Sequence, residues 1–241
     1  MEDFRFSVAR RLMRWLMPSY RLGWPQLAWW HDESFNNYLA KFDELGGLNT
    51  ARRWMLGQLL RLVVDVPGDT AECGVFEGAG SYLIAMSHGF RQQARRHHIF
   101  DSFEGLSEPQ DVDGSYWRRG DMARSFDRIS TRLADVPGLV WHRGWIPHTF
   151  AEVKNCRFSF VHIDVDLYQP TRDSLSFFYD RLNPGGIIVC DDYQFTTCPG
   201  ATKAVEEILA DKPEKMLTLP SGGGFFIKGT KTAPFTLLAS E

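Results

Sequence analysis

The chain has 241 residues, of which 44% are hydrophobic and 24% are charged, and its formal net charge is −3. This length can bury a full hydrophobic core and suits one α/β domain with a small N-terminal addition. The balance of charge argues against a nucleic-acid-binding protein, because neutralising phosphates requires a broad basic surface.

The first 30 residues alternate arginines with bulky apolar side chains. Four of the apolar residues fall on one face of a predicted helix: Val8, Leu12, Trp15 and Leu16. Pro18 and Pro25 prevent a longer helix. The apolar face has two interpretations, which are peripheral contact with a membrane or a partner protein, and packing on its own domain or on a second subunit. We favour packing.

A helix is predicted from Asn49 to about Val64, because apolar residues recur there at helical spacing and Pro67-Gly68 follow. We therefore expect residues 1–66 to form a helical cap or lid and residues 67–241 to form the main domain.

Short β-rich runs alternate with helical stretches from Asp69 onward, which predicts parallel strands joined by helical crossovers. The expected strands cover residues 70–73, 98–100, 139–141, 158–163 and 186–190. A helix over 202–210 and strands over 216–219 and 222–228 complete the chain. The last two strands are expected to form an antiparallel pair at the end of a mostly parallel sheet.

A glycine-rich turn follows the first strand. Glycines let a ligand approach the backbone closely, and free amides at the start of the next helix can bind a polar or anionic group. The spacing is acidic-x-Gly-x-x-x-Gly-x-Gly and not the GxGxxG of dinucleotide enzymes, which favours the cofactor site of a methyltransferase. The residues expected at this site are Glu72, Gly74, Phe76, Glu77, Gly78, Gly80 and Ser81.

A second cofactor contact is predicted at the end of the next strand, where Asp101 lies 21 positions after the last glycine of the loop. An acidic residue there can accept hydrogen bonds from both ribose hydroxyls; capping of the following turn is the alternative. Ser102 and Phe103 follow it and belong to the expected site. After the third strand come Gly144 and Trp145, and the indole ring either flanks the adenine or packs in the core.

Ionisable residues gather at the ends of the next two strands. His162, Asp164 and Asp166 share one face while their strand persists. Asp191 and Asp192 directly follow the adjacent strand. Burying carboxylates close together is costly unless a cation or proton compensates them. Helix capping by these aspartates is the alternative.

Three of the carboxylates, Asp164, Asp191 and Asp192, offer oxygen ligands that suit a hard cation such as Mg²⁺. Such an ion can hold two vicinal sugar or catechol oxygens and lower the pKa of the reacting hydroxyl. Asp166 is the preferred general base. His162 either orients a carboxylate, accepts the proton, or is a satisfied core residue.

Four motifs together resemble the macrocin O-methyltransferase family, which methylates sugar hydroxyls in macrolide and aminocoumarin antibiotic pathways. The similarity runs from about Leu48 to Ala210. Its motifs are residues 67–78, 100–106, 162–168, and 182–186 leading into 191–193.

The resemblance implies a Rossmann-like class I methyltransferase fold with a doubly wound sheet, S-adenosylmethionine as the methyl donor, and Mg²⁺ bound by Asp164, Asp191 and Asp192. It also implies that Asp166 is the catalytic base. Asp164 is the rival candidate for the base, and it is expected to contact the cofactor as well. Family members carry a mobile N-terminal lid and commonly self-associate, so a homo-oligomer is expected. The first 30 residues do not match that lid.

We therefore predict an O-methyltransferase that acts on a sugar hydroxyl of a natural product or glycan, with a catechol or phenol as the alternative acceptor. The four cysteines show neither a CxxC pair nor a zinc-site spacing, which indicates a cytoplasmic protein, and no apolar run is long enough to span a bilayer. An NAD-dependent oxidoreductase or epimerase is disfavoured by the glycine spacing and by the lack of a Tyr-x-x-x-Lys pair. The intact set of aspartates disfavours a silent binding module.

Overall fold

The structure is a computed structural model that describes residues 2–18, 27–90 and 95–233. The chain divides into two compact units, Met1–Lys41 and Phe42–Glu241. The functional boundary predicted at residue 66, between a lid and a cofactor domain, stays a prediction.

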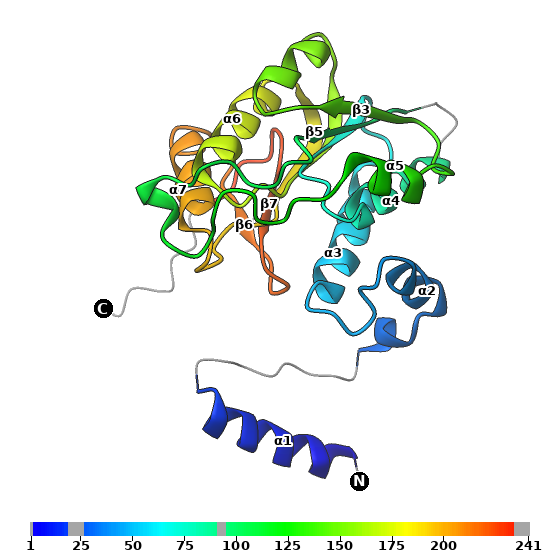
Figure 1. The fold of residues 1–241 in the computed structure, drawn as a ribbon, viewed down its shortest axis with the longest axis vertical. Helices are drawn as coiled ribbons and strands as arrows, with labels where there is room; N and C mark the ends of the chain where they lie inside the picture. The colour runs from blue at the N-terminus through cyan, green and yellow to red at the C-terminus, as the bar shows by residue number, and fades with distance from the viewer. Residues whose placement is uncertain (1, 19–26, 91–94, 234–241) are drawn as a thin grey trace. The chain divides into compact units, whose positions relative to one another are not determined.

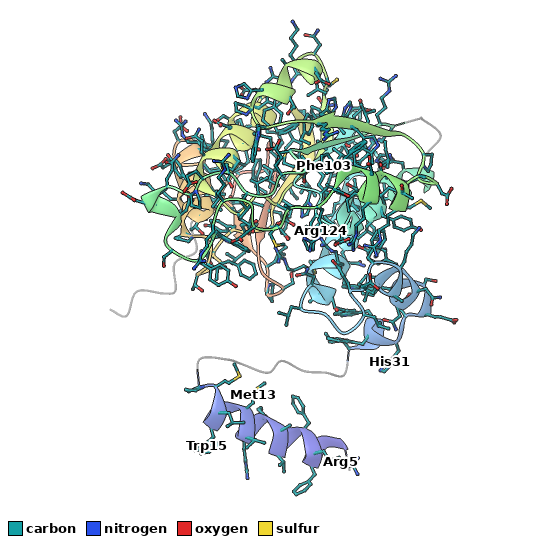
Figure 2. All side chains as sticks on the ribbon, in the orientation of Figure 1. Arg5, Met13, Trp15, His31, Phe103 and Arg124 are labelled. Atoms are coloured by element: carbon teal, nitrogen blue, oxygen red, sulfur yellow. The ribbon has the colours of Figure 1, made fainter. Side chains whose placement is uncertain are left out.

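The smaller unit is helical. It contains α1 (Glu2–Leu16), the 3₁₀ turn η1 (Ala28–His31) and α2 (Glu33–Lys41). The four apolar residues predicted on one helix face lie within α1, and Trp15 is among the side chains drawn in Figure 2. Among the residues that the structure describes, no helix has both the length and the apolar character that crossing a membrane requires.

A seven-stranded sheet forms the centre of the larger unit, in the order β3-β2-β1-β4-β5-β7-β6 (Figure 1). The parallel strands are β1 (Asp69–Cys73), β2 (His97–Asp101), β3 (Leu139–Arg143), β4 (Phe158–Ile163) and β5 (Leu182–Cys190). At one edge, β7 (Gly224–Ile227) pairs antiparallel with both β5 and β6 (Leu217–Thr218). The predicted strands and the antiparallel ending are confirmed.

From β1 the chain passes to β2 and β3 on one side, and then crosses back to β4 on the other side of β1, so a crevice opens between the carboxyl ends of β1 and β4. The elements around the sheet are α3 (Thr50–Leu60), η2 (Arg61–Val63), α4 (Ala79–Met86), η3 (Ser87–Phe90), η4 (Asp111–Asp113), α5 (Phe126–Arg132), η5 (His148–Val153), α6 (Tyr168–Tyr179) and α7 (Pro199–Ile208). The helix predicted from Asn49 is confirmed as α3 continued by η2.

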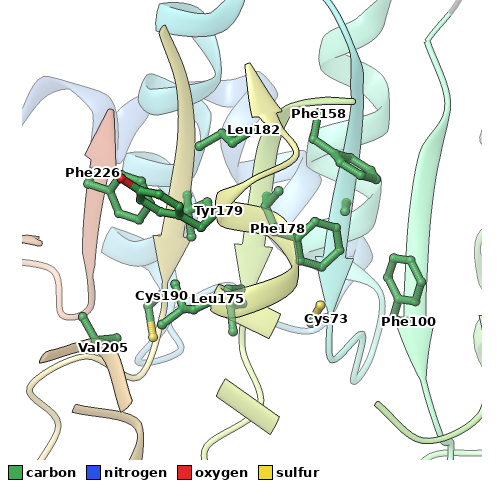
Figure 3. Close-up of a cluster of buried hydrophobic side chains, with 14 of the residues drawn as sticks. Cys73, Phe100, Phe158, Leu175, Phe178, Tyr179, Leu182, Cys190, Val205 and Phe226 are labelled. Carbon is green, nitrogen blue, oxygen red and sulfur yellow. The ribbon is translucent and has the colours of Figure 1, made fainter. Parts of the chain in front are cut away.

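The two faces of the sheet are both covered. Ile188 of β5 joins Leu175 and Phe178 of α6 in the main core, which Figure 3 shows. Its neighbour Ile187 faces the other layer, where it packs with apolar residues of α3 and α4, among them Leu56. Because both faces are buried, β5 ends in a continuous apolar run, Ile187–Cys190, and does not alternate polar with apolar residues there.

Candidate functional site

A pocket of about 660 Å³ lies at the carboxyl ends of the parallel strands, where the strand order reverses. The loops after β1, β2, β3, β4 and β5 all contribute to its wall. Of the predicted cofactor residues, those that line it are Gly74, Phe76, Asp101, Ser102, Gly144, Trp145 and Asp164.

The other predicted residues of the glycine loop lie beneath the pocket and support it. Glu72 is buried, accepts a hydrogen bond from the Ser81 hydroxyl, and lies 2.9 Å from His162 Nδ1 through its Oε1 atom. A Cβ at Gly80 would collide with the Glu72 carboxylate, and a Cβ at Gly74 would collide with the backbone oxygen of Asp164. These two glycines are therefore required by close packing, of α4 on β1 at Gly80 and of two loops at Gly74.

Glu77 anchors a cluster of three arginines and does not line the pocket. Its carboxylate lies 2.6 Å from Arg124 Nε, 3.0 Å from Arg128 Nη2 and 2.8 Å from Arg132 Nη1. The guanidinium of Arg124 also lies 4.2 Å from the ring centre of Phe76. Glu77 thus ties α5 and the segment before it to a residue of the pocket wall.

Phe103 and Gly78 also lie outside the pocket wall. The ring of Phe103, labelled in Figure 2, packs 5.1 Å from Phe126 of α5 and 6.1 Å from Trp141 of β3. Gly78 precedes α4 with a φ of 87°, and a Cβ there would press on the Leu133 side chain.

Asp101 caps the neighbouring turns, which was one of the two roles that the sequence left open, and its contact with the ribose stays a prediction. Its Oδ2 accepts a hydrogen bond from the Val75 amide at 2.7 Å and its Oδ1 accepts one from the Phe103 amide at 2.6 Å, so it does cap the turns. It also lines the pocket. Burial raises the pKa of Asp101, while these amides oppose that shift. Each carboxylate oxygen has a second lone pair that can accept a hydrogen bond from a ligand hydroxyl.

The strand that carries the ionisable residues is shorter than the alternation argument requires. β4 ends at Ile163, so Asp164 and Asp166 lie in the following turn, and Asp166 has a φ of 59°. The amides of Val165 and Asp166 donate to Asp192 Oδ2 at 3.1 and 2.8 Å. The structure thus corrects the reason for their proximity: a turn held by Asp192 gathers them, and not one face of a strand.

The carboxylates form two adjacent groups. Ligand atoms of His162, Asp164 and Asp191 lie within 4.8 Å of one another, and so do those of Asp166, Asp192 and Cys198. The predicted metal ligands Asp164, Asp191 and Asp192 are therefore divided between the two groups.

Arg52 of α3 is a charged residue of the pocket wall that the sequence did not single out. It forms an ion pair with Asp191 Oδ2, and its Nη2 lies 3.0 Å from the Asp191 backbone oxygen. On the other side, His162 Nε2 lies 3.6 Å from Asp191 Oδ1. Although burial favours the neutral acid, Arg52 and His162 hold the pKa of Asp191 well below its usual range.

His162 is buried beneath the pocket and is held between two carboxylates. Although burial opposes its charge, the hydrogen bonds with Asp191 and Glu72 raise the pKa of His162 to about 10. The side chain is therefore a cation at neutral pH that orients Asp191. The alternative role of His162, in which it accepts a proton from the substrate, stays a prediction.

The other three carboxylates, those of Asp164, Asp166 and Asp192, lie close together with too little positive charge nearby to balance them. Burial and the negative charge of Asp191 raise the pKa of Asp164 to about 7. Burial raises the pKa of Asp166 to about 6, and burial with the charge of Asp166 raises that of Asp192 well above its usual range. Closely spaced, undercompensated carboxylate oxygens are what a hard divalent cation binds. The chemistry of these oxygen donors therefore suits Mg²⁺, and the three predicted ligands would have to draw together from the two groups to bind one ion.

Three more residues of the pocket wall escaped the sequence analysis: Trp117, Phe195 and Cys198. The Trp117 Nε1 atom lies 3.3 Å from Cys198 Sγ, which in turn lies 3.6 Å from Asp166 Oδ1. Nothing in the sequence distinguishes Arg52 from its neighbour Arg53, which pairs with Glu44 at 2.9 Å. Such assignments depend on contacts between distant segments.

The sheet order, the glycine loop after β1 and the acidic residue at the end of β2 define a class I methyltransferase fold. Comparison with known proteins agrees. Residues 56–213, more than half of the chain, match the macrocin O-methyltransferase (TylF) family, and the chain belongs to this family.

Two curated relatives come from Streptomyces. The chain is 31% identical over 153 residues to the 8-demethyl-8-(2,3-dimethoxy-α-L-rhamnosyl)-tetracenomycin-C 4'-O-methyltransferase of Streptomyces olivaceus, covering 58% of each chain. It is 26% identical over 185 residues to the demethyldecarbamoylnovobiocin O-methyltransferase of Streptomyces niveus, covering 67% of this chain and 66% of the relative. The matches thus span less than two thirds of the relatives' own length.

Solved structures share the fold. The O-methyltransferase NovP superposes with a TM-score of 0.62 at 26% identity, over 74% of this chain and 80% of that chain. The calicheamicin methyltransferase CalS11 superposes with a TM-score of 0.67 at 21% identity, over 89% of this chain and 97% of that chain, which bears on the fold alone.

Proposed function

We propose that the chain transfers a methyl group from S-adenosylmethionine to a hydroxyl of a sugar moiety, with the assistance of Mg²⁺. The observation that carries this proposal is the shared pocket: Asp164, Asp166 and Asp192 line the same cavity as Gly74 and Asp101. An acidic wall that suits a divalent cation therefore lies beside the predicted cofactor site.

The donor would bind along the first half of the pocket. Asp101 accepts hydrogen bonds from the ribose hydroxyls through the lone pairs that the Val75 and Phe103 amides leave free. Trp145 lies in the wall after β3, where its ring would flank the adenine. Gly74 and Phe76 line the cavity between these groups and the aspartates.

The metal would be held by Asp164 and Asp192, with Asp191 joining through Oδ1, the oxygen that does not pair with Arg52. When bound, Mg²⁺ orients two vicinal hydroxyl oxygens and lowers the pKa of the one that reacts. Arg52 and His162 keep Asp191 ionised, so this carboxylate is available for binding at neutral pH.

Asp166 is the proposed base. Its pKa of about 6 leaves it largely ionised at neutral pH, yet close enough to neutrality to accept the proton that the acceptor hydroxyl loses. Two contacts hold Asp166 in place. The Cys198 thiol lies 3.6 Å from Asp166 Oδ1, and the Asp166 backbone amide donates a hydrogen bond to Asp192.

A sugar acceptor is supported by the names of the relatives, which methylate a rhamnosyl 4'-hydroxyl in one case and the 3''-position of mycinamicin III in another. The test is transfer of labelled methyl from S-adenosylmethionine to glycosides with a vicinal diol, compared with catechols, each with Mg²⁺ and with chelator. Metal-dependent transfer to the glycosides supports the proposal. Transfer to catechols alone would assign the other acceptor class, and reduction of NAD would remove the proposal altogether.

A further inference from the structure

Three side chains able to bind a metal meet at the amino-terminal edge of the sheet. Asp69 is the first residue of β1, His98 is the second of β2, and Cys156 lies shortly before β4. Their ligand atoms lie within 4.8 Å of one another. The methyltransferase pocket begins beyond the other end of β1, at Gly74. The cluster is therefore separate from the site described above.

His98 belongs to a chain of polar contacts that ends in a carboxylate on each side. His142 Nδ1 lies 2.7 Å from Glu152 Oε2, and His142 Nε2 lies 2.9 Å from His98 Nδ1. His98 Nε2 then lies 3.2 Å from Asp69 Oδ2. Both imidazole rings are buried, with His98 only 3% exposed.

Counting protons along this chain leaves one contact without a hydrogen. A neutral imidazole has one N–H and one lone pair. His142 donates to Glu152, so its Nε2 must accept the N–H of His98 Nδ1. His98 Nε2 then presents a lone pair to Asp69 Oδ2, which also has only lone pairs. Two neutral rings thus supply two hydrogens for three contacts. With His142 donating to Glu152, the contact without a hydrogen lies between His98 and Asp69, where a metal ion or an added proton can bridge the two lone pairs.

The geometry suits zinc at this position. Tetrahedral Zn²⁺ with bonds of about 2.0 Å to nitrogen and oxygen separates these two ligand atoms by about 3.3 Å, and the observed separation is 3.2 Å. Asp69 Oδ1 is occupied by the Arg96 amide at 3.0 Å, which leaves Oδ2 for the metal. The Cys156 sulfur lies within 4.8 Å of both ligand atoms, and its side chain is partly buried and forms no disulfide. Water would take the fourth position.

The contacts behind His98 are those that orient a ligating histidine. Such a residue usually donates its second ring N–H to a carboxylate or another acceptor, which fixes the tautomer and makes the ligating nitrogen more basic. His142 and Glu152 provide this relay. Glu152 lies in η5 and Cys156 lies just after it, so one short segment carries both the ligand and the end of the relay.

We propose that Asp69, His98 and Cys156 bind one Zn²⁺ ion, which fastens the segment between η5 and β4 to the first two strands of the sheet. The ion lies at the end of the sheet opposite to the pocket, so it takes no part in the chemistry proposed there. The inference does not depend on the proposed methyl transfer.

The test uses Co²⁺ as a spectroscopic probe for this site, added to the full chain in the presence of excess Mg²⁺. One equivalent should produce a thiolate-to-cobalt charge-transfer band together with the intense visible bands of tetrahedral coordination, and Zn²⁺ should displace both. Cys156→Ser should abolish the charge-transfer band. His98→Gln should weaken Co²⁺ binding by about 10–100-fold or more.

Cys198→Ser is the matched control, because Cys198 is the other thiol that lies among carboxylates. This variant should keep the band. Zn²⁺ should also raise the melting temperature of the parent and of Cys198→Ser, and have less effect on Cys156→Ser, whose side chain is not fully buried. No thiolate band in the parent, or a band lost only in Cys198→Ser, would overturn the proposal and assign a bound proton to the gap between His98 and Asp69.

Discussion

Replacing Arg52 by methionine tests how charge is arranged in the pocket. The substitution keeps an unbranched side chain but removes the cation paired with Asp191, and the two side chains are 18% and 10% exposed. Breaking a buried ion pair by removing one partner costs about 3–5 kcal/mol, because it leaves a buried charge uncompensated. His162 still lies 3.6 Å from the other oxygen of Asp191, so we expect the lower end, about 3 kcal/mol.

The assay is thermal unfolding followed by circular dichroism. In a chain of this size each kcal/mol shifts the midpoint by roughly 2–4 °C, so the melting temperature of Arg52→Met should fall by about 6–12 °C. Excess Mg²⁺ should restore part of this loss, because the metal then compensates Asp191. Mg²⁺ should therefore stabilise the variant more than it stabilises the parent.

Arg61→Met is the control, because Arg61 is exposed at the end of the same helix and hydrogen-bonds only to Gln58 among the contacts of its side chain in the described residues. An exposed substitution of this kind should change stability by no more than about 0.5 kcal/mol. Equal melting temperatures for the two variants, or a loss in Arg52→Met that Mg²⁺ leaves untouched, would refute the charge arrangement.

The remaining predictions concern catalysis and cofactor binding. Asp166→Asn should lower the rate of methyl transfer by about 10²–10⁴-fold with unchanged affinity for S-adenosylhomocysteine by calorimetry; a fully active variant would exclude Asp166 as the base. Because the base must be ionised and the pKa of Asp166 is about 6, the parent's rate should rise between pH 5 and 7 and then level off, and a flat profile over that range would contradict this assignment. Asp101→Ala should weaken S-adenosylhomocysteine binding by roughly 1.5–3 kcal/mol, the value of hydrogen bonds to a charged group, and unaltered affinity would remove Asp101 from the ribose site. Chelation should abolish the activity and Mg²⁺ should restore it; activity that survives chelation would separate the carboxylates from any metal role.

Much of the fold could be predicted because it depends on local patterns. The apolar runs of β4 and β5 are buried on both faces, so their sequences identify strands directly. The turn at Gly74 was also predictable, although the structure gives a different reason for it. A Cβ at Gly74 would strike the Asp164 backbone, and this contact joins residues 90 positions apart.

The contacts that complete the site depend on tertiary packing. Arg52 meets Asp191 across 139 positions of the sequence. No local spacing predicts this pair, since Arg53 has the same neighbours along the chain and pairs elsewhere. The cluster of Asp69, His98 and Cys156 is a further case, because its three residues come from separate strand ends and form no recognisable zinc motif.

The proposed function places the metal close to the methyl donor, and this distance is open to direct measurement. Mn²⁺ can replace Mg²⁺ as a paramagnetic probe, and the relaxation of the methyl protons of bound S-adenosylmethionine then reports their distance from the ion. We expect strong broadening of the methyl resonance in the parent. In a variant that carries both Asp164→Asn and Asp192→Asn, the resonance should be sharp. A methyl resonance that stays sharp while cofactor and Mn²⁺ are both bound would contradict the account.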